Sequence, residues 1–395
     1  MPVVIDNRPR WMRRRRLGAV KTALKLVLAT VLILAYLAAI FHFYRLEAPW
    51  GKQKDAATPG QTAVKPQVYT PAEASAPTAR DITTKTVTVT KTITATTART
   101  VTATTTVYSK EQIIRAVVDR INEYRAKEGT PPVKYMETKS AQFRAEYMHQ
   151  HNIFSHYDKE GRHPAYYWTK LDGGLYGFEE NAGWFRCIGD CINPLNDTLQ
   201  LIYFMVYEDA FSLWGHRDSI LDPCNNYVSI GLSYDSYSLY ITVHMIAKWV
   251  EWIEPPRYEN GVFRAKGVVV EPRLKPESEN GYTFYQVFIY RDVPNPSNVH
   301  RHSYSVGDLY AGVLPKDYPG YYTKTKTIRA EKLYARRVES GWLFEVEFLF
   351  RPEEPGLYTI VMFAKNNLGV SWKPMSPGGE ARLERCELFA YTVEK

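Results

Sequence analysis

The sequence lacks the short motifs that would assign it to a large enzyme class. It has no His-Glu-x-x-His, no Gly-x-Ser-x-Gly, no phosphate-binding glycine loop and no dinucleotide fingerprint. Cysteine is scarce, with four in 395 residues, and the spacing lacks the closely repeated pairs of a four-cysteine zinc site. Motifs alone therefore give no metalloprotease, serine hydrolase, nucleotide hydrolase or dehydrogenase.

A basic stripe interleaved with stacking aromatics is also missing. The net charge of +8 comes from a cluster at the N-terminus, with Arg8, Arg10 and the run at residues 13–16. Beyond residue 107, acidic and basic residues are mixed and roughly balanced. Because the basicity is confined to one end, the sequence predicts no nucleic-acid partner.

A long apolar segment follows this basic cluster. Residues 26–44 are nineteen residues without a formal charge, and as a helix they would span about 28 Å, close to the thickness of a bilayer core. Because the arginines precede the segment, residues 1–25 are predicted to be a cytoplasmic tail and residues 46–395 extracellular. A cleaved signal peptide is the alternative, but no small-x-small site follows the segment. The prediction is a single-pass cell-membrane protein with an uncleaved signal anchor.

Residues 45–107 have little that could form a core. The part from 51 to 80 is rich in Ala, Pro, Thr, Gln and Lys, which is typical of a disordered linker. Residues 83–106 are dominated by Thr and contain no acidic residue, glycine or proline. This composition predicts an extended stalk that could carry O-linked glycans, and it is similar to the Thr-rich stalks of archaeal surface proteins.

Helical periodicity begins at Tyr108. Ser109 and Gln112 fit a capping box, and further helices are expected at residues 138–151 and 199–210. Two β-rich runs joined by a short polar turn follow, at residues 227–234 and 239–249. Helices followed by paired strands predict an α+β or three-layer α/β/α domain over residues 108–252.

Three short islands with chemically useful side chains occur within this domain. They are Phe154-Ser155-His156, Glu179-Glu180-Asn181-Ala182, and Gly215-His216-Arg217 followed by Ile220-Leu221-Asp222-Pro223. Their order and spacing resemble the CAP/SCP superfamily of cysteine-rich secretory, antigen 5 and pathogenesis-related 1 proteins, especially its prokaryotic branch. The resemblance covers about 145 residues. It implies an α-β-α sandwich around a largely antiparallel sheet.

The same resemblance implies a central cavity lined by His156, Glu180 and His216, with Asn181 beside them. The family often adds a second glutamate before the Gly-His motif, and Glu208 is the candidate if its helix continues for two further turns. Two imidazoles and a carboxylate also suit a divalent metal such as zinc, so His156, His216 and Glu180 are candidate metal ligands.

Three functions remain open from the sequence. The first is a non-enzymatic binding protein whose cavity takes a lipid, a glycan, a peptide or a metal-bridged ligand. The second is a metal-dependent, peptidase-like hydrolase that uses Glu180 as general base on a water held by His156 and His216. The third is a structural cell-envelope protein in which the histidines are hydrogen-bonded scaffold. The breadth of binding roles in the family favours the first.

The cysteines and one sequon suggest covalent features of an extracellular chain. Cys187 and Cys191 flank a short loop and could bridge locally, or either could pair with Cys224. Cys386 lies far along the chain and is expected to stay unpaired. Asn196, in Asn-Asp-Thr, is the candidate N-glycosylation site.

The sequence of the C-terminal part predicts β-structure. Glu254-Pro255-Pro256 suggests a domain boundary, so residues 255–395 are assigned to a second domain. Residues 342–350 alternate large apolar side chains with glutamates, as a half-buried strand does. Further β-rich runs separated by Asn-Gly, Ser-Gly and Pro-Gly predict a β-sandwich, immunoglobulin-like in type.

Overall fold

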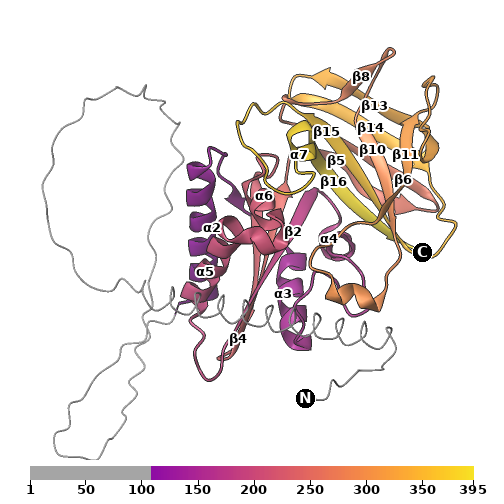
Figure 1. The fold of residues 1–395 in the computed structure, drawn as a ribbon. Helices are drawn as coiled ribbons and strands as arrows, with labels where there is room; N and C mark the ends of the chain where they lie inside the picture. The colour runs from indigo at the N-terminus through magenta and orange to yellow at the C-terminus, as the bar shows by residue number, and fades with distance from the viewer. Residues whose placement is uncertain (1–107) are drawn as a thin grey trace, which may run out of the picture. The chain divides into compact units, whose positions relative to one another are not determined.

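The computed structural model describes residues 108–395 (Figure 1). The predicted cytoplasmic tail, the signal anchor at 26–44 and the Thr-rich stalk lie outside the described residues. Between residues 108 and 395, no helix has both the length and the apolar character needed to cross a bilayer.

The helices of the N-terminal half begin where the sequence supplies caps. The Ser109 side chain accepts the Gln112 N–H, and the Gln112 side chain accepts the Ser109 N–H, which confirms the predicted capping box. The Thr138 hydroxyl caps the next helix. The helices are α2 (Lys110–Lys127), α3 (Lys139–His151), α4 (Pro164–Asp172), α5 (Pro194–Tyr207) and α6 (Gly215–Leu221), with a 3-10 turn, η1, at Asp209–Ser212.

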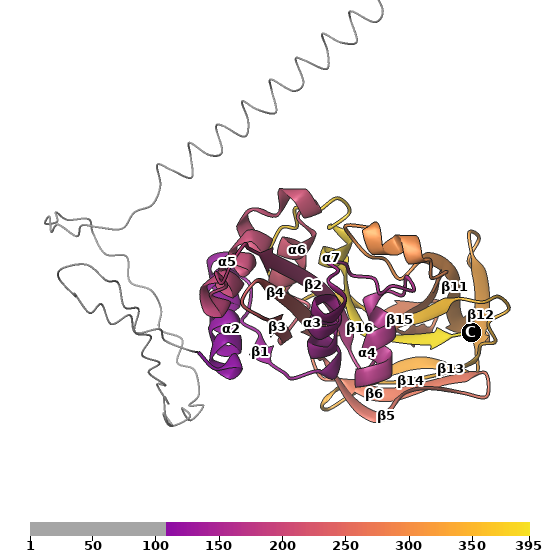
Figure 2. The same cartoon turned by 90° about the horizontal axis from the view of Figure 1, so that it is seen from below.

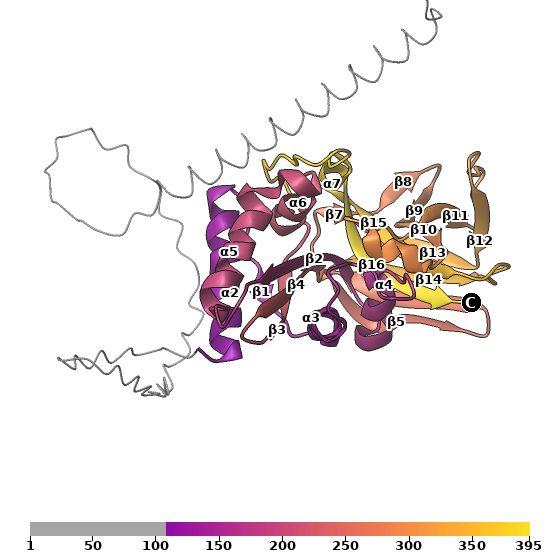
Figure 3. The ribbon, with the colours of Figure 1, turned by 60° about the horizontal axis from the view of Figure 1, so that its bottom comes forward.

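These helices enclose a four-stranded sheet in the order β1-β3-β4-β2. Its strands are β1 (Lys134–Tyr135), β2 (Gly177–Arg186), β3 (Tyr227–Tyr234) and β4 (Ser238–Ala247). β1 pairs in parallel with β3, and the other pairs are antiparallel. α2 and α5 cover one face of the sheet and α3 covers the other (Figure 3). The predicted mixture of helices and paired strands is confirmed, whereas β2 was not predicted.

The C-terminal part consists almost entirely of strands. One sheet has the order β13-β14-β6-β5 and the other β12-β11-β10-β15-β16, with β7 added to β15. The elements are β5 (Val250–Glu259), β6 (Val262–Val269), β7 (Leu274–Lys275), β8 (Glu277–Glu279), β9 (Tyr282–Phe284), β10 (Gln286–Asp292), η2 (Pro296–His300), β11 (Asp308–Pro315), β12 (Lys326–Ala330), β13 (Lys332–Val338), β14 (Gly341–Leu349), β15 (Leu357–Asn366), α7 (Ala381–Glu384) and β16 (Arg385–Glu394). The prediction of an immunoglobulin-like arrangement stays a prediction.

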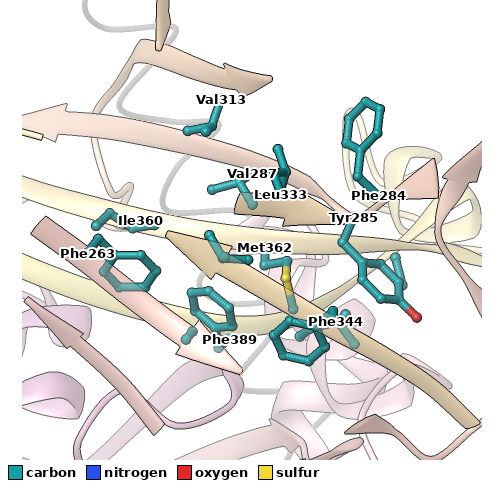
Figure 4. Close-up of a cluster of buried hydrophobic side chains, with 14 of the residues drawn as sticks. Phe263, Phe284, Tyr285, Val287, Val313, Leu333, Phe344, Ile360, Met362 and Phe389 are labelled. Atoms are coloured by element: carbon teal, nitrogen blue, oxygen red, sulfur yellow. The ribbon is translucent and has the colours of Figure 1, made fainter. Parts of the chain in front are cut away.

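A single apolar core lies between these two sheets (Figure 4). Phe263 and Phe344 from one sheet meet Ile360, Met362 and Phe389 from the other, and all five side chains are buried. Burying a large apolar side chain of this kind contributes roughly 1.5–3 kcal/mol relative to leaving it exposed. The two sheets therefore stabilise each other through their inner faces.

The proline pair expected to mark a boundary lies inside a strand instead. Pro255 and Pro256 fall within β5, at positions where its register against β6 is irregular. β5 is an edge strand, so the missing proline N–H groups break no ladder on the open side. The chain thus enters the C-terminal sheets at Val250.

The C-terminal part covers the free edge of the first sheet. β2 is an edge strand, and two of its N–H groups donate to C-terminal side chains. The Phe178 N–H donates to Glu387 Oε1 at 3.3 Å, and the Glu180 N–H donates to the Tyr304 hydroxyl at 2.9 Å. β16 lies beside β2 (Figure 2). Satisfying these N–H groups protects the edge from pairing with another chain.

The cysteines add a covalent link at the same place. Cys224 pairs with Cys386 across 162 residues, and Cys187 pairs with Cys191. The expectation that Cys386 is unpaired is therefore wrong, because the fold of the C-terminal sheet returns β16 to the loop after α6. The local bridge between Cys187 and Cys191 is one of the alternatives that the sequence left open.

Candidate functional site

A cavity of about 380 Å³ lies at the free edge of β2. Residues of both parts of the chain line it. The N-terminal part contributes His156, Ala165, Phe178, Glu179, Glu180, Asn181, Ser212, Gly215, His216 and Ser219, and the C-terminal part contributes His302, Ser303, Tyr304, Ser305, Val306, Val361, Arg382, Glu387 and Ala390. The structure thus brings four of the sequence-predicted site residues to one cavity: His156, Glu180, Asn181 and His216.

Glu180 is the most constrained of these residues. Its side chain is fully buried, and its oxygens accept from Arg144 Nε at 3.2 Å, His156 Nδ1 at 3.1 Å and His244 Nε2 at 3.1 Å. Burial alone would raise the pKa of Glu180, but the charge of Arg144 and the two histidine hydrogen bonds hold it far below its usual range. The carboxylate is therefore ionised and fully engaged.

The register of the sheet explains this arrangement. Glu180 on β2 stands directly opposite His244 on β4, so their side chains project from the same face as neighbours. α3 packs on that face and places Arg144 over the pair. Arg144 also donates from Nη2 to the Ser155 carbonyl at 2.7 Å, which fixes the loop that carries His156.

The two cavity histidines are each oriented by a carboxylate. His156 Nδ1 donates to Glu180, and His216 Nδ1 donates to Asp209 Oδ1 at 2.8 Å. Burial lowers the pKa of His156, although the hydrogen bond to Glu180 opposes this. Because a carboxylate only accepts hydrogen bonds, Nδ1 of each ring donates the bond, and Nε2 is the ring nitrogen left for another partner. The ring centroids lie 6.3 Å apart.

Glu208 does not take the fourth position suggested by the sequence. α5 ends at Tyr207, so the two further helical turns that would bring Glu208 toward His216 do not exist. Glu208 is exposed and does not line the cavity, whereas its neighbour Asp209 is buried and holds His216. Leu213 and Trp214, which follow η1, both adopt positive φ, a strained conformation for large side chains.

Asn181 ties the cavity wall together. Its side-chain amide donates to the Ser219 hydroxyl at 3.0 Å and to the Val243 carbonyl at 3.2 Å. These bonds join β2 to α6 and β4. Asn181 therefore lines the cavity with a side chain whose donors already have protein partners.

The donor set of the cavity fits a divalent metal only in part. The two imidazoles fit, because each has its Nδ1–H on a carboxylate and its Nε2 free of protein partners among the described residues, which is the usual arrangement around a metal-bound histidine. Glu180 does not fit as a ligand, because Arg144 and His244 both donate to its Oε2 and His156 donates to its Oε1. Within residues 108–395, no three His, Cys, Asp or Glu side chains stand together as a ready metal site.

Several site residues were missed by the sequence. Arg144 and Asp209 lie near the recognised islands, and His244 lies in the β-rich run at residues 239–249, but none of the three belongs to an island. Tyr304 comes from the C-terminal part, and its ring lies 4.9 Å from that of His156. Burial raises the pKa of Tyr304 well above its usual value, so its hydroxyl stays protonated. These four residues could be predicted from the sequence only if the strand register and the contacts between the N-terminal and C-terminal parts were already known.

A second group of charges lies beside the cavity. Arg382 forms ion pairs with Glu179 and with Asp222, the latter at 3.1 Å, and Glu387 lies near them. Burial and the neighbouring Glu179 raise the pKa of Glu387 to about 8, and the same causes raise that of Asp222 to about 6. We call these four residues the junction cluster. It also lines an adjoining cavity of about 440 Å³.

The fold and the site together define a class. A four-stranded, mostly antiparallel sheet between helical layers carries a Glu and two His at one edge. Residues 118–247 match the model of the cysteine-rich secretory protein family, abbreviated CAP. This part of the chain is a CAP domain, as the three islands predicted. A search among curated proteins found no match.

Three solved structures illustrate the similarity. NaASP2 with Zn²⁺ is 13% identical over 35% of this chain and 80% of its own, with a TM-score of 0.27. An extracellular protein containing an SCP domain from Bacillus anthracis str. Ames is 16% identical over 38% of this chain and 47% of its own, with a TM-score of 0.28. The CAP domain of Enterococcal PrgA is 18% identical over 39% of this chain and 68% of its own, with a TM-score of 0.27.

The predicted glycosylation site lies away from the cavity. Asn196 is exposed in the first turn of α5, near the Cys187–Cys191 loop, and does not line the cavity. Its modification stays a prediction.

Proposed function

We propose that this chain is a non-enzymatic binding protein of the cell surface whose CAP domain holds a ligand in the cavity beside β2. The observation that carries the proposal is the state of Glu180. A general base must be able to take a proton near the working pH. Glu180 has its oxygens engaged by Arg144, His156 and His244 and its pKa far below the usual range, so it is poorly suited to activate water.

The free Nε2 atoms of His156 and His216 define what the cavity can hold. Two lone pairs suit a divalent cation, or a ligand that donates hydrogen bonds, such as an amine or a sugar hydroxyl. A bound cation would supply a positive centre for ligand oxygens. Apolar lining residues, including Phe178, Val306 and Val361, suit the apolar part of a lipid, glycan or peptide.

The second part of the proposal concerns the cellular location of the protein. The apolar run at residues 26–44 and the arginine cluster before it support a single-pass anchor, with the CAP domain outside the cell. Protease treatment of intact cells checks this, with tags at the two ends. Loss of a C-terminal tag and protection of an N-terminal tag are expected, and protection of both would contradict the proposed orientation.

Zinc titration of the full-length chain in mild detergent tests the site. We expect the parent to bind one equivalent and the double variant His156→Ala, His216→Ala to bind at least about tenfold more weakly. His149→Ala is the control, because His149 hydrogen-bonds Ser233 and Asp235 outside the cavity. No binding by the parent at saturating zinc would overturn the metal part of the proposal. Peptide or ester turnover by the parent that is lost in a folded Glu180→Gln variant would overturn the non-enzymatic part.

A further inference from the structure

A third imidazole lines the cavity that holds His156 and His216. His302 belongs to the connection between β10 and β11, outside the residues that match the CAP family. Its side chain is exposed, and its ring packs edge-on against Phe211 with centroids 5.2 Å apart. No hydrogen bond engages either ring nitrogen of His302 within the described part of the chain. Both nitrogens are therefore open to a ligand.

We propose that His302 is the third ligand of a divalent-cation site shared by the CAP domain and the C-terminal part. This inference rests on the proposed function, since His156 and His216 supply the other two ligands. Three imidazoles with an open fourth position form a recurrent ligand set for zinc. The three side chains do not stand as a formed site between residues 108 and 395, so cation binding requires the exposed His302 side chain to turn inward.

Hydrogen bonds to the CAP domain hold the backbone on both sides of His302. Two residues later, the Tyr304 hydroxyl accepts the Glu180 N–H, and the Ser305 N–H donates to the Tyr157 hydroxyl at 3.2 Å. On the other side, Asn298 donates to the Gly161 carbonyl at 3.3 Å. These contacts hold the backbone on both sides of His302 against the CAP domain, while the ring of His302 itself packs only on Phe211 among the described residues.

The close fit of this connection depends on a glycine. Gly161 has a φ of +84°, and a Cβ there would lie 2.0 Å from the Asn295 carbonyl oxygen. A larger residue would push the two loops apart. The sequence at Gly161 thus permits the approach that brings a C-terminal histidine to the CAP cavity.

A neighbouring histidine offers a matched control. His300 lies two residues away on the same connection, is also exposed, and does not line the cavity. Replacing it changes the same kind of side chain with little effect on the cavity. If His302 only covers Phe211 at the surface, both replacements should leave cation binding unchanged.

Cobalt titration separates these cases, because imidazole coordination of Co²⁺ is visible in its absorption spectrum. The full-length chain in mild detergent is compared as parent, His302→Ala and His300→Ala. We expect His302→Ala to bind Co²⁺ at least about tenfold more weakly than the parent and with an altered spectrum. His300→Ala should match the parent in both measurements.

The outcomes distinguish the two proposals. Parent-like affinity and spectrum in His302→Ala, with a parent that binds cobalt, would overturn the role of His302 and leave the His156–His216 pair standing. A parent that binds neither cobalt nor zinc would overturn both. Weakening by His300→Ala to the same degree as by His302→Ala would also overturn the assignment, because the effect would then come from the connection as a whole.

Discussion

Glu179 and Glu180 are adjacent on β2 and have opposite surroundings. Strand geometry sends their side chains to opposite faces of the sheet. Glu180 is one carboxylate among Arg144, His156 and His244, whereas Glu179 shares the single Arg382 with Asp222 and lies near Glu387. One face has a surplus of donors, and the junction cluster has a surplus of acids. The donors around Glu180 keep its carboxylate ionised. In the junction cluster, the stability of the folded protein depends on whether the crowded acids are protonated.

The largest expected effect comes from removing the charged donor, Arg144, from the surroundings of Glu180. Arg144→Met removes the one guanidinium that residues 108–395 place on Glu180 and leaves a buried carboxylate uncompensated, which should reduce the free energy of unfolding by about 3–5 kcal/mol. Arg382→Met should cost less at pH 5, because the junction acids can take up protons and Arg382 is partly exposed. Chemical denaturation at pH 5 and pH 8 measures both. Equal losses for both variants at pH 5 would contradict the comparison.

A smaller effect is expected from Glu387. Its pKa in the folded protein is about 8, above the ordinary 4.5, so folding favours the protonated form. The contribution of Glu387 to the free energy of unfolding should therefore be fully present below about pH 4.5 and be lost as the pH rises to about 8. Glu387→Gln keeps the hydrogen-bonding shape without the charge, and at pH 9 it should exceed the parent in stability by about 1–3 kcal/mol.

Thermal unfolding between pH 4 and pH 9 checks this expectation. Glu384→Gln is the control, since Glu384 lines the same adjoining cavity but is exposed. The control should follow the parent at every pH. A Glu387→Gln curve parallel to that of the parent would show that Glu387 is ionised without penalty in the folded protein.

The smallest expected effect concerns the hydrogen bond that joins the two parts at Glu180. Tyr304→Phe keeps the ring beside His156 and leaves the Glu180 N–H without its acceptor, which should cost about 1 kcal/mol. Tyr321→Phe, at an exposed tyrosine, should have no effect. Denaturant midpoints of the two variants provide the measurement. Identical midpoints would mean that water replaces the Tyr304 hydroxyl at no loss.

Local signals in the sequence predicted much of the CAP domain. The Ser109–Gln112 capping box depends on residues three apart, and the β3–β4 hairpin depends on one short turn. β2 was missed because Glu179, Glu180 and Asn181 interrupt the apolar alternation that identifies a strand. Those polar groups are tolerated there because Arg144, Arg382 and Ser219 meet them from other elements.

The position of Glu208 is determined by where helix α5 ends. Its spacing from His216 fits two turns of a continuous helix, but the chain leaves the helix at Tyr207 and turns through η1. Asp209 then faces His216 in its place. Leu213 and Trp214, which precede Gly215, both have positive φ, and the identity of these two residues does not predict it.

The sequence by itself determined the family islands, the positions of His156, Glu180 and His216, and the two classes of secondary structure. Only the tertiary structure decided which groups surround them. His244 meets Glu180 through strand register, Tyr304 reaches it across 124 residues, and Cys386 reaches Cys224 across 162. Such contacts depend on how two sheet edges meet in space, whereas sequence patterns report only the periodicity of each element. For the same physical reason, the ionisation of Glu180 and Glu387 was set by their neighbours after folding.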